Sequence, residues 1–132
     1  MIRERLGKEL LYFEGGMGTL LQERGLEPGE LPETWNLTHA EEIREIHRSY
    51  IEAGSDIILT NTFGANALKF HDDTYSLEQI VTSAVGHVRA AAETAGAGRP
   101  IYTALDIGPT GKLLKPMGDL DFETAYEAFK EV

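Results

Sequence analysis

Residues 56–64, Asp-Ile-Ile-Leu-Thr-Asn-Thr-Phe-Gly, change abruptly from an apolar run to polar residues and a glycine. The run shows no alternation of apolar and polar residues, which is typical of a strand with helices on both faces. Two other stretches have the same form: residues 10–13 (LLYF) and residues 101–107 (IYTALDI). We therefore predict three fully buried strands, at 10–13, 56–61 and 101–107.

Amphipathic helices are expected after these strands. The signals for their starts are the capping-box pairs, and the signals for their ends are glycines. In chain order these residues are Thr38 with Glu41, Gly54, Ser76 with Gln79, and Gly96. A third helix is predicted after Asp121, with Phe122, Ala125, Tyr126 and Phe129 on its apolar face.

The order of strand and helix, repeated three times, predicts a parallel sheet with right-handed crossovers. A closed eightfold barrel takes ~250 residues, whereas this chain has 132. The expected fold is therefore α/β: the first three βα units of a TIM (βα)8 barrel, with parallel strands and an incomplete barrel. Because the last apolar face runs to Val132 without a cap, we expect residues 1–132 to be the N-terminal part of a larger domain.

Composition limits the possible partners. The chain has 12 Lys and Arg against 22 Asp and Glu, a net charge of -10, which disfavours nucleic acids and anionic membranes. It contains neither a bilayer-spanning apolar run nor the apolar core of a signal peptide, so a cytoplasmic location is expected. It has no cysteine and hence no thiol nucleophile, disulfide or thiolate zinc site of its own.

Polar residues and glycines follow each predicted strand, at residues 14–16, 60–64 and 106–111. Ligands of parallel α/β folds bind at these strand ends. Glu14 suits a cation, whereas the backbone N–H groups of Gly15 and Gly16 before a helix suit an anion. Together they would recognise a zwitterion such as an amino acid.

Two other interpretations of these residues remain. The glycines and Asn61 can simply form turns and caps, with Asp106 capping its own turn. A phosphate-binding α/β enzyme is also possible, although neither the P-loop spacing nor GxGxxG occurs and Glu14 would repel a phosphate.

Three long strings carry a resemblance to a known family: FEGGMGTLLQERG, LPETWNLTHAEEIREIHRSYIEAGSDIILTNTFGAN and DIGPTGKLLKPMGDLDFETAYEAF. They resemble the homocysteine S-methyltransferase family, and more narrowly the N-terminal homocysteine-binding module of cobalamin-dependent methionine synthases. The resemblance implies a TIM barrel that binds homocysteine at its C-terminal face. It also implies a zinc ion held by three cysteines, which binds the substrate thiol as a thiolate. Cobalamin and methyltetrahydrofolate would belong to other domains.

The resemblance places the substrate-binding residues at the strand ends. They are Glu14, Gly15, Gly16, Asn61, Thr62, Phe63 and Asp106. The family usually has Asp at the position of Glu14. Its zinc cysteines lie beyond residue 132, so no catalytic residue, no metal ligand and no methyl transfer are expected of this chain alone. Homocysteine, the remaining part of the barrel and other methionine synthase domains are the expected partners. The alternative is a noncatalytic half-barrel that self-associates as a homo-oligomer.

Other conspicuous residues have structural interpretations. We expect His47 to be packed among apolar neighbours and Trp35 to anchor the first long loop. Residues 71–73, His-Asp-Asp, are expected to form a solvated loop rather than a metal site. His39 and His87 belong to no evident constellation, and Lys112 and Lys115 are free to meet a partner domain.

Overall fold

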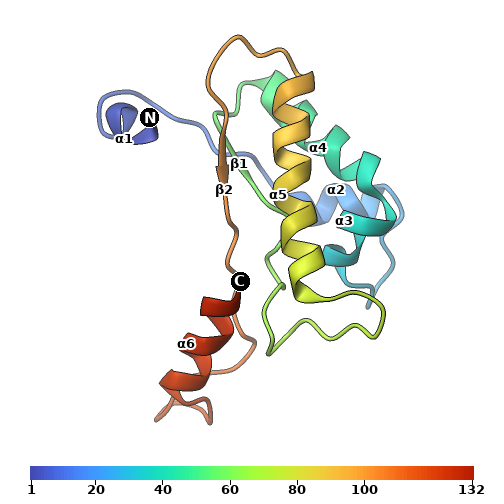
Figure 1. Cartoon of the computed structure of the whole chain (residues 1–132), viewed down its shortest axis with the longest axis vertical. Helices are drawn as coiled ribbons and strands as arrows, with labels where there is room; N and C mark the ends of the chain where they lie inside the picture. Colours follow the sequence, from blue (N-terminus) through green and yellow to red (C-terminus); the bar gives the residue numbers. More distant parts are fainter.

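The computed structural model describes all residues from 1 to 132 (Figure 1). It contains seven helical elements, of which one is a short 3-10 helix, and a sheet of two short strands. In chain order the elements are α1 (Ile2–Arg5), α2 (Met17–Glu23), η1 (Pro32–Thr34), α3 (Trp35–Thr38), α4 (Ala40–Ala53), β1 (Ile57–Leu59), α5 (Leu77–Thr94), β2 (Tyr102–Ala104) and α6 (Phe122–Glu131). None of these helices combines the length and the apolar character needed to cross a membrane.

The sheet is parallel, as predicted, but smaller than predicted. Ile57 to Leu59 pair with Tyr102 to Ala104, and the predicted first strand contributes only a single parallel bridge between Phe13 and Ile57. The prediction of a fully buried strand at 10–13 is therefore wrong, and the Phe13 residue is 59% exposed. No helix covers these residues, so burial does not stabilise an extended ladder there.

The second and third predicted strands are present in shortened form. The prediction 56–61 contains β1, whose Ile57 and Ile58 are buried. The prediction 101–107 contains β2, but its residues are half-buried or exposed rather than fully buried. Figure 1 shows α4 and α5 side by side on one side of the two strands, with α6 apart from them. The helices thus cover one face of the sheet instead of both.

The core lies between the helices and β1. One group joins α2, α3 and α4 through Leu21, Trp35, Ile43 and Ile46. A second group packs α4 and α5 on β1, and its members are Ile51, Ile58, Val88 and Ala91. A third group holds the loop after β1 against α5 through Ala65, Phe70 and Ile80. Burial of these apolar side chains fixes β1, and so fixes the positions of the residues that follow it.

The predicted helix signals have mixed outcomes. Ser76 and Gln79 form the predicted reciprocal cap of α5, and Gly54 ends α4 in the left-handed conformation with φ 115°. Thr38 does not cap α4: it is the last residue of α3, its hydroxyl donates to Thr34 O, and His39 precedes α4 instead. A residue with helical φ and ψ cannot adopt the extended N-cap conformation.

The predicted apolar face of α6 is only partly buried. The helix begins after Asp121, as expected, and Ala125 is buried. Phe122 is 67% exposed and Tyr126 is also exposed. This is a correction to the prediction, and its cause is that α6 lies apart from α4 and α5 (Figure 1).

Asp56, at the start of β1, holds the N-terminal segment against the sheet. Its carboxylate lies 3.4 Å from Arg5 Nη2 and 3.6 Å from Arg99 Nε, and it accepts the N–H of Tyr12 at 3.1 Å. We expect Asp56→Asn to lower the free energy of unfolding by about 2 kcal/mol, because the two arginine side chains lose the negative charge between them. Urea unfolding measures this change.

A matched control for Asp56→Asn is the exposed pair of Glu41 and Arg44, whose charged atoms are 3.3 Å apart. Glu41→Gln is expected to change stability by less than about 0.5 kcal/mol, since solvent screens exposed pairs. Equal effects of the two substitutions would contradict the role given to Asp56.

Candidate functional site

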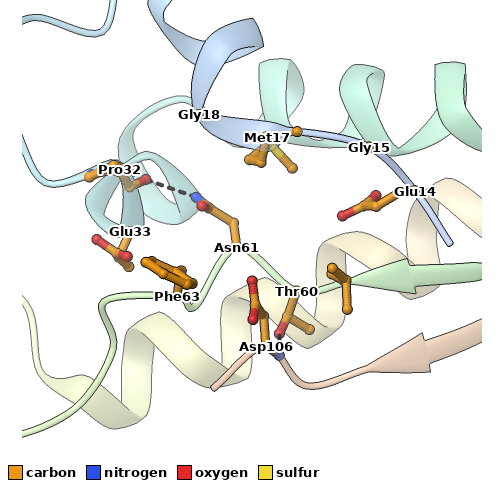
Figure 2. Close-up of a pocket in the computed structure, with 12 residues that line it drawn as sticks. Glu14, Gly15, Met17, Gly18, Pro32, Glu33, Thr60, Asn61, Phe63 and Asp106 are labelled. Carbon is orange, nitrogen blue, oxygen red and sulfur yellow. Dashed lines mark hydrogen bonds between the residues drawn. The ribbon is translucent and has the colours of Figure 1, made fainter. Parts of the chain in front are cut away.

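A pocket of about 310 Å³ lies at the carboxyl ends of the strands (Figure 2). Its lining residues come from the segment after Phe13, the start of α2, η1, the end of β1 and the loops after β1 and β2. They are Glu14, Gly15, Gly16, Met17, Gly18, Pro32, Glu33, Leu59, Thr60, Asn61, Phe63 and Asp106. Every residue predicted to bind substrate lines this pocket except Thr62. The segments that the sequence places far apart therefore meet at one edge of the sheet, as expected for a parallel α/β fold.

Glu14 presents a buried carboxylate at one side of the pocket. Its side chain is 2% exposed, and its Oε2 lies 3.1 Å from Nδ1 of His47 on α4. Figure 2 shows the carboxylate directed from the backbone toward the pocket. His47 is fully buried, which confirms the expectation that it is packed, but its contact with Glu14 is not evident from the sequence.

Gly15 and Gly16 lie in an irregular segment that leads into α2, and Gly16 is extended, with φ -68° and ψ 121°. No acceptor in the chain takes the backbone N–H of either glycine, so both N–H groups are available to a ligand. The ring of Tyr50 lies against this segment, and its hydroxyl donates to Gly16 O at 3.2 Å. A Cβ at Gly15 would lie 2.8 Å from the Tyr50 hydroxyl oxygen, so a larger residue there would displace the Tyr50 side chain. Burial, together with the charge of Glu14, raises the pKa of Tyr50.

Asn61 is held by a reciprocal pair of amide contacts. Its Nδ2 donates to Pro32 O at 2.8 Å, drawn as the dashed line in Figure 2, and more weakly to Asn36 Oδ1 at 3.3 Å. Asn36 Nδ2 in turn donates to Asn61 O at 2.8 Å. The amide hydrogens of Asn61 thus fix the loop after β1 to η1 and α3.

Three residues join the ends of β1 and β2. Thr62 donates to Asp106 O at 2.8 Å, and its oxygen lies 2.7 Å from Thr60 Oγ1, which accepts the N–H of Asp106 at 3.1 Å. Thr62 therefore supports the pocket from behind instead of lining it. Asp106 lines the pocket, and burial raises the pKa of its carboxyl.

Glu33 is a lining residue that the sequence analysis missed. It is buried, and its Oε1 accepts the N–H of Gly64 at 2.5 Å. Met17, Gly18, Pro32 and Leu59 were also missed. Gly18 belongs to the same glycine-rich stretch as Gly15, which is the signal that could have included it. Glu33 lies in η1 and carries no local signal of its contact with Gly64.

The charges around the pocket are all negative. Glu14, Glu33 and Asp106 line it, and no lysine or arginine does. This arrangement favours a ligand with a cationic group and opposes a phosphate, which weighs against the phosphate-binding interpretation.

The donor set for a metal ion differs from the one that the family resemblance implies. The chain has no cysteine, and no group of three or more His, Cys, Asp or Glu side chains is arranged to hold a metal. The residues of this chain therefore do not fit a thiolate zinc site.

His87 belongs to a buried polar network, contrary to the expectation that it joins no constellation. Its Nδ1 accepts from Arg44 Nε at 3.1 Å, and its Nε2 lies 2.6 Å from Asn36 O. Because Asn36 contacts Asn61, the network connects α5 with the pocket wall. Burial lowers the pKa of His87.

We expect His87 to make the stability of the chain depend on pH. Its pKa is lower in the folded state than the ~6.5 of an unfolded histidine. The unfolded chain therefore binds the proton first, so this stability is complete above pH ~6.5 and is lost as pH falls through the folded pKa. His87→Gln, which retains a donor for Asn36 O, should reduce the loss, as measured by urea unfolding between pH 7 and pH 5. An unchanged pH profile would contradict this role.

The remaining residues have structural roles. Trp35 is buried, donates from Nε1 to Glu30 Oε1 at 2.8 Å and stacks on His39, so it anchors the first long loop as predicted and His39 does have a partner. Asp72 Oδ1 accepts the N–H groups of Thr74 and Tyr75 at 2.8 and 2.7 Å, which is an ordinary turn. Lys115 is not free, because its Nζ lies 2.8 Å from Asp121 Oδ1.

The fold and the pocket define an α/β protein with an anionic, glycine-edged site at the ends of parallel strands. Residues 11–132 match the homocysteine S-methyltransferase family. The chain therefore belongs to the homocysteine S-methyltransferase family, and the resemblance drawn from the sequence is confirmed.

Individual relatives agree with this assignment. The chain is 32% identical over 139 aligned positions to the methionine synthase of Mycobacterium leprae, covering 97% of this chain and 11% of the relative. It is 31% identical to the methionine synthase of Mycobacterium tuberculosis, covering 96% of this chain and 11% of that protein. The chain thus spans about 11% of the length of these relatives.

Solved structures show the same fold. The oxidized form of the homocysteine methyltransferase MmuM from Escherichia coli superposes with a TM-score of 0.69 at 25% identity, over 83% of this chain and 41% of that one. The metallated form of MmuM gives a TM-score of 0.67 at 26% identity, over 83% and 42%.

Proposed function

We propose that this chain forms the homocysteine-recognition part of a homocysteine methyltransferase of the methionine synthase type. The observation that carries the proposal is the meeting of Glu14, Gly15 and Gly16 with the ends of β1 and β2 around one pocket. Family membership supports homocysteine as the ligand. The printed names of the relatives, methionine synthase and homocysteine methyltransferase, agree with it.

The pocket suggests how the amino-acid end of homocysteine binds. Its ammonium would contact the Glu14 carboxylate, and its carboxylate would accept the available N–H groups of Gly15 and Gly16. Asn61, Thr62, Phe63 and Asp106 would then form or support the walls around the side chain. The negative lining favours the ammonium in preference to a phosphorylated ligand.

We further propose that residues 1–132 are the N-terminal part of the homocysteine-binding domain and contain the first three βα units of its barrel. The parallel bridge between Phe13 and Ile57 supports the placement of residues 10–13 as the first strand. Pairing with further strands would extend that ladder and bury Tyr12 and Phe13, which are exposed here.

Methyl transfer would require groups from outside this chain. In the family-based proposal, zinc activates the homocysteine thiol, while cobalamin and methyltetrahydrofolate bind to other domains. A chain without cysteine cannot supply the thiolates of such a zinc site. We therefore expect the 132-residue chain to take part in binding and to show no methyl transfer alone.

Isothermal titration with homocysteine tests the proposal. Binding is expected in the millimolar range, because only part of the substrate is enclosed, and Glu14→Gln should weaken it at least about tenfold by removing the charge that faces the ammonium. Inorganic phosphate is the comparison ligand. Binding of phosphate without binding of homocysteine would overturn the proposal in favour of a phosphate site.

A second candidate function is that of a noncatalytic half-barrel that self-associates. Exposed apolar residues favour it, and those on the strand segments are Leu10, Tyr12, Phe13, Leu105 and Ile107. Size-exclusion light scattering tests this candidate. A concentration-dependent oligomer that Ile107→Lys disperses would support it, whereas a monomer at high concentration would exclude it.

A further inference from the structure

The contact between His47 and Glu14 joins α4 to the edge of the pocket. The two residues are 33 positions apart, and their side chains are 0% and 2% exposed. An ionised carboxylate can only accept a hydrogen bond, so Nδ1 of His47 carries the hydrogen and donates it to Oε2 of Glu14. His47 Nε2, on the other side of the ring, is buried without a partner.

The two oxygens of Glu14 have different surroundings. Oε2 accepts from His47, whereas no group of the chain donates to Oε1. The only buried side-chain polar atoms without a partner are Arg5 Nη1 and His47 Nε2. Oε1 has no partner and is not fully buried, and Glu14 lines the pocket, so Oε1 is accessible from the pocket.

The same face of α4 also contacts the segment of Gly15 and Gly16. Tyr50, one turn of helix after His47, donates to Gly16 O and packs against Gly15. One helix face thus supports both halves of the recognition stretch: His47 supports the carboxylate, and Tyr50 supports the backbone N–H groups.

From this arrangement we propose that His47 is a positioning residue for ammonium recognition, which occupies Oε2 of Glu14 and leaves Oε1 directed at the ammonium of the ligand. This inference rests on the proposed function, in which Glu14 binds the ammonium of homocysteine. A specific consequence is that His47 affects ligands with an ammonium and leaves ligands without one unaffected.

Two substitutions of similar size separate positioning from packing. His47→Asn keeps an N–H donor near the position of Nδ1, whereas His47→Leu fills a similar volume without any donor. Both substitutions disturb packing, and only the second removes the hydrogen bond to Oε2. Circular dichroism and urea unfolding of both variants show whether each is folded before binding is measured.

The decisive measurement compares homocysteine with 4-mercaptobutanoate, which is homocysteine without its ammonium. We expect His47→Leu to weaken homocysteine about tenfold, the effect of a lost charge-assisted hydrogen bond, with 4-mercaptobutanoate changed less than about twofold. His47→Asn should retain most of the homocysteine affinity. Equal weakening of both ligands, or no weakening of homocysteine by His47→Leu, would overturn the positioning role.

A measurement without ligand separates this inference from the proposed function. In ¹⁵N–¹H correlation spectra of the imidazoles, the wild-type His47 should carry its hydrogen on Nδ1, and Glu14→Ala should abolish that preference. This result would support the hydrogen bond between His47 and Glu14 even if homocysteine failed to bind. A failure of homocysteine to bind would then show only that the proposed function is wrong. A wild-type imidazole with its hydrogen on Nε2 and none on Nδ1 would overturn the pairing itself.

Discussion

Gly108→Ala is expected to destabilise the chain by about 3 kcal/mol, since overpacking of this severity lies at the upper end of its usual cost. A Cβ at this position would overlap Phe63 O and would lie 2.9 Å from the Phe63 ring. Because Gly108 follows β2 and Phe63 follows β1, the substitution would also push apart the two loops that line the pocket. Urea unfolding measures the loss of stability, and titration with homocysteine measures whether the displaced loops weaken ligand binding.

Gly86 provides the matched control. It lies within α5, and a Cβ there would meet no atom within 4 Å. Gly86→Ala should therefore stabilise the chain by roughly 0.5–1 kcal/mol, because alanine favours the helix. Two glycine-to-alanine changes with opposite signs would confirm the close approach of the loops, and a neutral Gly108→Ala would refute it.

Ile58→Ala is expected to lower the free energy of unfolding by about 3 kcal/mol, the usual size for a large-to-small change in a core. Ile58 is 0% exposed, and it packs with Ile51 and Val88 between β1 and the helices α4 and α5. Domains of this size are typically stable by only about 5–15 kcal/mol, so the loss is a large part of the total. Thermal and urea unfolding give the value.

The control for Ile58→Ala is the same substitution at Ile107, an exposed position in the loop after β2. Ile107 is 53% exposed, so Ile107→Ala should change stability by less than about 0.5 kcal/mol. A similar loss for both isoleucines would mean that the region around Ile107 is covered in solution, as the self-associating half-barrel requires.

The sequence predicted helix ends well where the signal depends only on residues within one helical turn of each other. The reciprocal cap of Ser76 and Gln79 and the glycine at position 54 depend only on neighbouring residues, and both are present. The pair of Thr38 and Glu41 has the same spacing but fails, because the preceding residues already form α3. Spacing alone does not reveal whether the first residue of the pair is extended or helical.

The strands were harder to predict, because burial depends on elements that are distant in sequence. Ile58 packs against Ile51 of α4 and Val88 of α5, so its apolar run forms a strand. Tyr12 and Phe13 belong to an equally apolar run, but no helix packs on them and only one bridge forms. An apolar run indicates a preference for burial, and the tertiary structure determines whether that preference is met.

The candidate site was predicted in outline from the rule that strand ends in parallel folds lie together. Glu14, Asn61 and Asp106 do line one pocket. The contacts that fix them, from His47 to Glu14 and from Glu33 to Gly64, join residues more than thirty positions apart and follow no local pattern. The residues that line the pocket could thus be anticipated from the strand ends, whereas the distant side chains that support them could not.

The most direct test of the central claim is to map homocysteine onto the chain by ¹⁵N–¹H correlation spectroscopy. We predict saturable shifts of the Gly15 and Gly16 amides, whose N–H groups have no acceptor in the chain, with Gly25 and Gly29 unmoved because they lie outside the pocket. Glu14→Gln should suppress these shifts at the same homocysteine concentration. Shifts confined to residues away from Gly15, Gly16 and Glu14 would contradict the account.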